Sequence, residues 1–585
     1  MTSRSLGRET PTVSSAPVQP SRRRFVTGLL LSQVSVFLTA CSRGVVTSPP
    51  SLLKPTMTTN PLTDAGAPID PIVQTTAGQV RGLSLTGIQV FKGVPYGAPT
   101  GGKNRFRAAK PAPAWQAIRD CKEYGPTAPQ GQYHFGSIDT AKTAQADPIR
   151  ASLAQALMGV SGKPHPASED CLVLNVFTPA TDRTKRPVMV WLHGGGFAIG
   201  SASTDLYDGR ALARHGDVVV VSLNHRLSAL GFLYLGDLDP AYADSANAGM
   251  QDIVLALKWV RDNIAAFGGD PDNVTLFGES GGGQKVGMLM AIPSAAGLFH
   301  KAIVQSGPAD RVVPRADAAL LARRLLEKLN IAENELQKLQ DLDVDVILQA
   351  AGDVQFPAFN LSSALAPVVD GNILPTQPFS PVAPDVSHKV PLLIGTNKDE
   401  FIPFLSGIPN LLQLSHDQAR DQAAQMIAGY GANLYDMYHA MIPDEQPLYL
   451  LCDLLTDLRF WSGSVRIAER KVIQATAPVY MYRLTWEAPG FGGFLRTPHG
   501  LDLPLVFGNL EMARVLIGTG PVPEKLSSAM MSAWIAFARH GNPSTPTLKW
   551  PRYDLAQRTT MEFNAVCAAE KDPLQARRVF WEQHA

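Results

Sequence analysis

A serine stands in a glycine-rich turn between two apolar stretches. Residues 273–284 read NVTLFGESGGGQ, and the helix-like run QKVGMLMAI begins at the end of this segment. Glycine weakens a helix by about 1 kcal/mol relative to alanine, so glycines at its start indicate another requirement. Gly278 and Gly282 would allow the tight strand-to-helix turn that presents Ser280 as a nucleophile. A purely structural turn is the competing interpretation of this motif alone.

A serine hydroxyl needs a base, and the oxyanion that it forms needs hydrogen-bond donors. The segment WLHGGGFAIG follows the apolar run PVMV, and its glycines let backbone N–H groups approach a ligand. We expect the amides of Gly195, Gly196 and Gly281 to form a three-donor oxyanion hole. His193 is expected to shape this loop rather than act as the base. Taken alone, the same segment is equally compatible with a flexible loop.

The acid and the base are less sharply marked. Asp399 and Glu400 follow the run PLLIGTN, at the end of a strand where open α/β sheets bind ligands, and position alone does not separate them. Five histidines follow Glu400 in the sequence: His416, His439, His499, His540 and His584. His499 lies in a loop with proline and glycine after the run VYMYRLTW, which suits a catalytic base. The resulting chain order is serine, acid, histidine.

Six short apolar runs predict the strands that would position these residues. Their continuous apolar character is typical of strands covered on both faces, as in a parallel sheet. They lie near residues 187–194, 217–224, 273–278, 301–307, 390–397 and 479–486. Between the second and the third, residues 248–269 carry apolar side chains at helical spacing. The pattern predicts an α/β domain with a mostly parallel central sheet and helices on both faces.

Three segments fit this alternation poorly: residues 131–167, 309–360 and 401–475. The last two have helical character, and we expect such insertions to form pocket walls. The chain of 585 residues has a formal charge of +1, which gives no reason to expect a nucleic-acid partner. No CxxC pair occurs, so a structural zinc site is not expected. A disulfide between Cys121 and Cys171 and two buried thiols are both open.

The N-terminus resembles an export signal. SRRRFVTGLLLSQVSVFLTAC has a basic cluster, a short apolar run and small residues before Cys41. The arginines resemble a bacterial twin-arginine signal, and residues 38–41 resemble a lipoprotein cleavage box, so Cys41 would carry lipid. An uncleaved anchor or a soluble signal peptide remains the alternative. We therefore expect a signal over 1–40, a flexible tether over 41–70, a catalytic domain over 71–585, and a periplasmic or cell-envelope location with lipid-mediated membrane attachment.

Many stretches between about residues 74 and 550 resemble the type-B carboxylesterase family, the branch of the α/β-hydrolases that includes the cholinesterases. They occur in the order of the family: FKGVPYGAP, RFRAAKPAPAW, SEDCLVLNVFTP, HGGGFAIGS, DNIAAFGGDPDNVTLFGESGGG, GLFHKAIVQSG, PVVDGNILP, IGTNKDEF, HGLDLPLVFG and WIAFARHGNP. The resemblance implies the α/β-hydrolase fold and hydrolysis of small-molecule carboxylic esters through an acyl-enzyme. It implies no metal and no organic cofactor.

Carried over residue by residue, the resemblance makes Ser280 the nucleophile, Glu400 the acid and His499 the base. It assigns the oxyanion hole to the same three amides, those of Gly195, Gly196 and Gly281. The family usually has alanine at position 281. Its early disulfide joins the cysteine of SEDC to a position aligned near Ala128, so Cys171 would lack that partner.

The resemblance leaves the substrate open. No aromatic residue lies between Leu157 and Asp170, where cholinesterases carry a choline-binding tryptophan, so choline esters are not expected. The same triad could act on carbamates, amides or polyesters. A catalytically idle binding or adhesion protein is the alternative of another class, and it would be expected to have lost a triad residue. The sequence does not indicate the oligomeric state.

Overall fold

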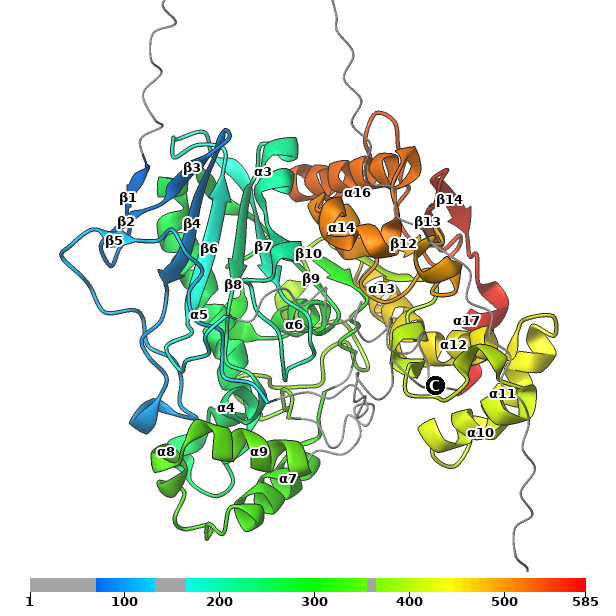
Figure 1. Ribbon diagram of the computed structural model, residues 1–585, viewed down its shortest axis with the longest axis horizontal. Coiled ribbons are helices and arrows are strands. Elements are labelled where there is room, and N and C mark those ends of the chain that lie inside the picture. The colour runs from blue at the N-terminus through cyan, green and yellow to red at the C-terminus, as the bar shows by residue number, and fades with distance from the viewer. Residues whose placement is uncertain (1–69, 132–164, 311, 355–364, 585) are drawn as a thin grey trace, which may run out of the picture. The chain divides into compact units, whose positions relative to one another are not determined.

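The six apolar runs form six neighbouring strands of one sheet (Figure 1). In chain order they are β7 (Arg186–Leu192), β8 (Val219–Leu223), β9 (Gly269–Glu279), β10 (Lys301–Gln305), β11 (Leu392–Asn397) and β12 (Val479–Leu484). Their spatial order is β8-β7-β9-β10-β11-β12, and every neighbouring pair is parallel. The computed structural model describes residues 70–131, 165–310, 312–354 and 365–584. The predicted parallel sheet is confirmed.

Further strands extend this sheet at both edges to eleven in total. Beyond β8 lie β6 (Val173–Thr178), β4 (Ile88–Pro95) and β3 (Leu83–Leu85), each antiparallel to its neighbour. Beyond β12 lie β13 (Thr559–Phe563), which is parallel to β12, and β14 (Ala568–Lys571), which is antiparallel to β13. A separate small sheet contains β1 (Ile72–Gln74), β2 (Gln79–Arg81) and β5 (Arg119–Asp120).

Helices cover both faces of the large sheet, as the apolar strands require. Along β7, Val188, Val190 and Leu192 enter one apolar cluster while Met189 and Trp191 enter another, because successive side chains point to opposite faces. The first face is covered by α4 (Ser228–Phe232), α5 (Ala248–Asn263), α6 (Gly281–Leu289) and α13 (Ser462–Gln474). The second is covered by α3 (Arg210–Gly216), α14 (Asp502–Phe507) and α16 (Pro521–His540).

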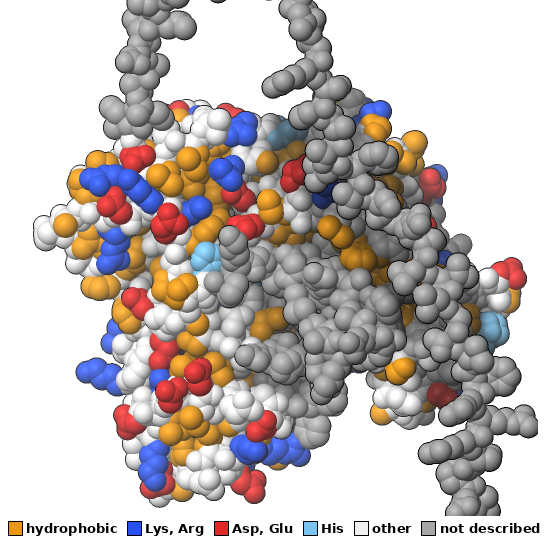
Figure 2. Space-filling model, viewed as in Figure 1, with side chains coloured by type: hydrophobic (Ala, Val, Ile, Leu, Met, Phe, Trp, Pro, Cys, Tyr) orange, Lys and Arg blue, Asp and Glu red, His pale blue; other side chains and the backbone are white. Residues whose placement is uncertain are grey.

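The predicted helical character of the two later insertions is confirmed. The first contains α7 (Arg315–Lys328), α8 (Lys338–Asp341) and α9 (Val344–Val354). The second contains α10 (His416–Met426), α11 (Gly431–Met441), α12 (Pro447–Thr456) and α13. Near the C-terminus are α15 (Arg514–Ile517) and α17 (Gln575–His584). Basic and acidic side chains lie interspersed over α7–α9 on the face shown in Figure 2.

The described residues belong to one compact unit, Gly66–Ala585. The predicted signal, the tether up to residue 69 and Cys41 lie outside the described residues, as does most of segment 131–167. Cys121 and Cys171 are both free and buried, which matches the interpretation as two buried thiols. No helix within the described ranges is both long and apolar enough to cross a membrane.

Candidate active site

Ser280 lies between the end of β9 and the start of α6, in a strained backbone conformation. Its φ of 55° and ψ of −124° are rare for a residue with a side chain. The Ser280 N–H donates to the carbonyl of Gln305 (2.9 Å), and its own carbonyl accepts from the N–H of Gln284 (3.0 Å). These bonds to β10 and to α6 hold the turn in the conformation expected for a nucleophile elbow.

Glycine is required on both sides of this turn. A Cβ at Gly278 would lie 2.5 Å from the carbonyl carbon of Gly282, and a Cβ at Gly282 would lie 2.0 Å from the carbonyl oxygen of Leu192. Both distances are far shorter than a van der Waals contact between unbonded heavy atoms. The sequence prediction that these two glycines permit a tight strand-to-helix turn is therefore confirmed.

The glycine loop after β7 lies directly against the start of α6. Gly195 and Gly196 have φ values of +86° and +62°, which glycine adopts without strain. A Cβ placed on Gly281 would lie 2.5 Å from the amide nitrogen of Gly196 and 2.3 Å from its carbonyl oxygen. The structure thus brings two of the three predicted oxyanion donors, Gly196 and Gly281, into contact, with Gly195 adjacent in the chain.

His193 at the start of this loop is fully buried. Its Nδ1 donates to the carbonyl of Gly194 (2.9 Å), and its ring stacks on that of His225 at a centroid distance of 4.9 Å. Burial, assisted by the nearby Lys285, lowers the pKa of His193 to about 3, so the ring is neutral at physiological pH. These contacts agree with a residue that shapes the loop.

Glu400 and His499 meet although 99 positions separate them in the sequence. Nδ1 of His499 donates to Oε2 of Glu400 over 2.6 Å, and the Glu400 side chain has no exposed surface. The N–H of Asn397, the last residue of β11, donates to Oε1 of the same carboxylate (2.6 Å). The carboxylate therefore fixes the proton of the imidazole on Nδ1 and leaves Nε2 as the basic nitrogen.

Asp399 serves a different purpose from its neighbour Glu400. Its Oδ2 accepts from the N–H of Thr497 (3.1 Å), and its own N–H donates to the carbonyl of Thr497 (3.0 Å). The side-chain amide of Asn397 also donates to the carbonyl of Pro498 (2.8 Å). The loops after β11 and β12 are thus joined, and this connection places His499 beside Glu400.

The other four histidine candidates have other surroundings. His416 and His439 stack on each other across α10 and α11 at a centroid distance of 3.9 Å. His584 donates from Nδ1 to the carbonyl of Phe580 (2.7 Å), and His540 is the last residue of α16. Within the described ranges, no group of three or more His, Cys, Asp or Glu residues is arranged to hold a metal ion.

Glu279 is a site residue that the sequence analysis did not single out. It directly precedes Ser280, its side chain is 5% exposed, and its Oε1 lies 3.1 Å from Nε2 of His499. The two atoms are within hydrogen-bonding distance but not in hydrogen-bonding alignment, so neither has a hydrogen-bond partner among the described residues. Its position directly before Ser280 was the available signal, but the direction of its side chain follows only from the folded turn.

The two carboxylates and burial shift the pKa values around His499. Burial alone would lower the pKa of His499, but the negative charges of Glu279 and Glu400 and the bond to Glu400 raise it to about 9. Burial raises the pKa of Glu279 to about 8, against the opposing influence of His499. The ring and the Glu279 carboxylate therefore compete for one proton on the side of Nε2.

Two aromatic rings lie beside His499. The ring centroids of Phe404 and Phe460 are 5.3 and 5.0 Å from that of the imidazole, and the two phenyl rings stack at 6.3 Å. Both come from the predicted insertion 401–475. This insertion therefore supplies apolar surface next to the candidate base.

Comparisons with known proteins identify the family. Residues 69–581 match the carboxylesterase family. The chain is 38% identical to para-nitrobenzyl esterase of Bacillus subtilis (strain 168), covering 87% of this chain and 97% of that one.

Solved structures agree. The Geobacillus stearothermophilus carboxylesterase EST55 is 34% identical with a TM-score of 0.75, covering 87% of this chain and 99% of that one. An esterase from Clostridium hathewayi that can hydrolyse aliphatic aromatic polyesters is 31% identical with a TM-score of 0.71, covering 88% of this chain and 98% of that one. The chain belongs to the type-B carboxylesterase family: it has the α/β-hydrolase fold and is a carboxylic-ester hydrolase.

Proposed function

We propose that this ester hydrolase works through a triad of Ser280, Glu400 and His499. The observation that carries the proposal is the 2.6 Å bond from Nδ1 of His499 to Glu400, which makes Nε2 the basic nitrogen of the neutral ring. Ser280 stands at a strained strand-to-helix turn next to Glu279, whose carboxylate reaches the same Nε2. The bond between base and acid, and the position of Nε2 beside the residue that precedes Ser280, support a triad for acyl transfer.

The reaction has two steps. Nε2 of His499 takes the Ser280 proton as the hydroxyl oxygen attacks the ester carbonyl, and the imidazolium then gives that proton to the departing alcohol. The product of this step is an acyl-enzyme on Ser280. Water, deprotonated by the same Nε2, attacks the acyl carbon; the bond to the Ser280 oxygen then breaks, and the imidazolium returns its proton to that oxygen, which releases the carboxylic acid and free Ser280. Glu400 stabilises the imidazolium in both steps without taking its proton.

The amides of Gly195, Gly196 and Gly281 are proposed as the oxyanion donors. The contact of Gly196 with Gly281 supports this assignment, because it brings the backbone of the loop after β7 against the first residue of α6. Loss of one such donor typically costs about a hundredfold or more in kcat.

We propose uncharged esters with an aromatic or apolar group as the substrate class. Phe404 and Phe460 present ring surface at the imidazole, and burial of apolar groups there would favour such substrates. The similarity to para-nitrobenzyl esterase suggests para-nitrobenzyl esters as a first substrate, and the similarity to the Clostridium hathewayi enzyme suggests aromatic polyesters as a second.

Initial rates on p-nitrophenyl acetate, butyrate and octanoate and on para-nitrobenzyl acetate test the proposal. Ser280→Ala should reduce turnover to background while the protein keeps its fold by circular dichroism. A stoichiometric burst of p-nitrophenol in the wild type would report the acyl-enzyme. Turnover retained by Ser280→Ala would refute the assignment of the nucleophile. A folded but silent wild type would favour an idle binding protein or a different acyl group.

We also propose export and lipid attachment at Cys41. The support is the sequence of residues 21–41, with its basic cluster, short apolar run and small residues before the cysteine. The mass of the mature N-terminus, measured on protein from the cell envelope, should show a lipid on Cys41. Cys41→Ser should release the protein from membranes. A mature chain that lacks lipid, or one that keeps residues 1–40, would refute the proposal.

A further inference from the structure

A buried lysine lies between the glycine loop and the nucleophile helix. Lys285 is the fifth residue after Ser280 and belongs to α6. Its side chain is fully buried, and Nζ donates to the carbonyls of His193 (3.0 Å) and Gly196 (2.8 Å). A lysine in this position is costly, since its head group leaves water and no carboxylate among the described residues pairs with it. Such a residue calls for an explanation beyond packing.

The two carbonyls that Lys285 binds flank the glycines of the loop. Bonds at both ends of this short span restrict the peptide planes between them, which include the N–H groups of Gly195 and Gly196. Gly281 allows the same loop to approach α6, because any Cβ there would overlap Gly196. Lys285 then holds the loop at that distance.

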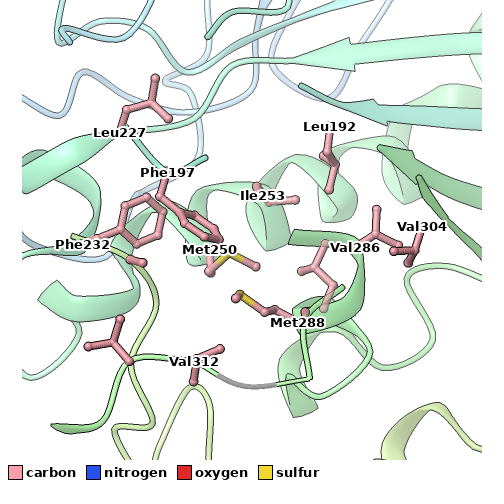
Figure 3. Packing of buried hydrophobic residues seen from close by; sticks show 14 of the residues in the cluster. Leu192, Phe197, Leu227, Phe232, Met250, Ile253, Val286, Met288, Val304 and Val312 are labelled. Carbon is pink, nitrogen blue, oxygen red and sulfur yellow. The ribbon is translucent and has the colours of Figure 1, made fainter. Parts of the chain in front are cut away.

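The residue after Gly196 is anchored as well. The ring of Phe197 packs edge-on against Phe232 at 5.2 Å, and Figure 3 shows both in the apolar cluster that receives Val286 from α6. Nζ of Lys285 lies 5.3 Å from the centroid of the Phe197 ring. The loop is therefore attached to the core through Phe197 and to the nucleophile helix through Lys285.

We infer that Lys285 is a positioning residue that aligns the oxyanion donors of the loop at Gly195 and Gly196 with the nucleophile turn. The inference rests on the proposed function. Burial lowers the pKa of Lys285 to about 7, with Glu279 opposing the shift. Both the ammonium and the neutral amine carry at least two N–H bonds, so either form can bind both carbonyls.

A matched pair of variants tests this role. Lys285→Met keeps the length of the side chain and removes both donors. Lys471→Met makes the same change at another fully buried lysine, on α13, whose Nζ donates to the carbonyl of Ser387 (2.8 Å) and to Gln474 (2.7 Å). Each variant is compared with wild type and Ser280→Ala for kcat, KM and melting temperature.

Lys285→Met is expected to lower kcat about 10- to 100-fold with KM changed less than threefold, because the loop amides act on the transition state. Its affinity for an aryl trifluoromethyl ketone, which forms an oxyanion adduct with the serine, should fall in parallel. Affinity for para-nitrobenzyl alcohol, which forms no oxyanion, should remain. Lys471→Met should change only the melting temperature.

A folded Lys285→Met enzyme with wild-type kcat and ketone affinity would overturn the inference. If this variant does not fold, Lys285→Gln, which is too short to bind both carbonyls, is measured with the same expectations. Failure of both to fold while Lys471→Met folds would assign Lys285 to stability and also overturn it. If the proposed function itself is wrong, the result is different: the wild type would not hydrolyse the esters, or Ser280→Ala would still hydrolyse them.

Discussion

The two halves of the candidate site are built in different ways. The half on β7, β9 and α6 consists mainly of backbone: a strained serine, close-packed glycines and a loop bound by Lys285. The half on the loops after β11 and β12 consists of side-chain hydrogen bonds, from His499 to Glu400 and from Asn397 to Pro498. The first half requires glycines, because a Cβ at the close contacts would overlap neighbouring backbone. The second half requires particular side-chain donors and acceptors, above all the imidazole of His499 and the carboxylate of Glu400.

The largest effect is expected in the side-chain half. Glu400→Gln should lower kcat/KM about 10³- to 10⁴-fold, because an amide N–H facing Nδ1 disfavours the tautomer whose Nε2 is basic. The N–H of Asn397 can still donate to the amide oxygen, so the fold should be retained. Ester hydrolysis by the purified variant, with circular dichroism as a control for folding, measures this. A loss below tenfold would show that another acid supports His499.

A smaller loss is expected in the backbone half. Gly281→Ala would place a Cβ 2.3 Å from the carbonyl oxygen of Gly196, so the loop must move and its amides lose alignment. We expect kcat to fall about 10- to 100-fold. Gly352→Ala is the control, since a Cβ there meets no atom within 4 Å.

Alanine is the usual residue of the family at position 281, which makes Gly281→Ala informative in either direction. Full activity of the variant would show that the loop can move back without losing the oxyanion donors. In that case catalysis would not require the close approach of Gly196 to Gly281. The backbone half of the site would then depend less on its glycines than described above.

The same contrast explains how much the sequence could predict. The backbone half is encoded in contiguous stretches, so the turn at Ser280 and the glycine loop could be read directly. The parallel strands were equally clear, because continuous apolar runs have few other uses. Asp399 and Glu400 could not be separated by position, since only the folded loops show which carboxylate reaches His499.

Other features of the site and the fold could not be predicted. Lys285 lies in an apolar helix, and its partners are carbonyls of a loop 89 to 92 positions away. Nothing in a single sequence indicates such a pairing. The five strands beyond the predicted six all contain polar residues, and β3 and β14 are only three and four residues long, so the apolar runs predicted six of the eleven strands. Cys121 and Cys171 were left undecided, because spacing alone does not fix the distance between two thiols.

Glu279 stands between the two halves, and its removal should shift the pH dependence. The free enzyme needs a neutral His499 as base, so kcat/KM should rise with pH through a group with a pKa near 9. Glu279→Gln removes a negative charge that favours the imidazolium, so the rising limb should move about one unit or more to lower pH. Measurements from pH 5 to 10 on p-nitrophenyl butyrate would record it. An unmoved limb would mean that Glu279 is protonated in the free enzyme.

The smallest effect on activity is expected at Asp399. Asp399→Asn should leave kcat/KM within about threefold, because its amide oxygen can still accept from Thr497 while Glu400 retains the contact with His499. A loss as large as that of Glu400→Gln would show that the two carboxylates act as a unit, and would contradict the division of roles described above.

Unlike activity, the stability of Asp399→Asn should differ clearly from that of the wild type, and the difference should depend on pH. Burial raises the pKa of Asp399 to about 6 from its ordinary value of 3.8, so the folded chain binds this proton more tightly than the unfolded chain. The free energy of unfolding of the wild type should therefore be about 3 kcal/mol lower above pH 6, where Asp399 is ionised, than at pH 4. Asparagine carries no such charge, so the melting temperature of Asp399→Asn relative to wild type should be higher at pH 8 than at pH 4. An equal difference at both pH values would show that ionised Asp399 does not destabilise the folded state, because Arg496 and Lys398 compensate its charge. The carboxylate would then act as a stabilising charge of the side-chain half rather than as a loop connector.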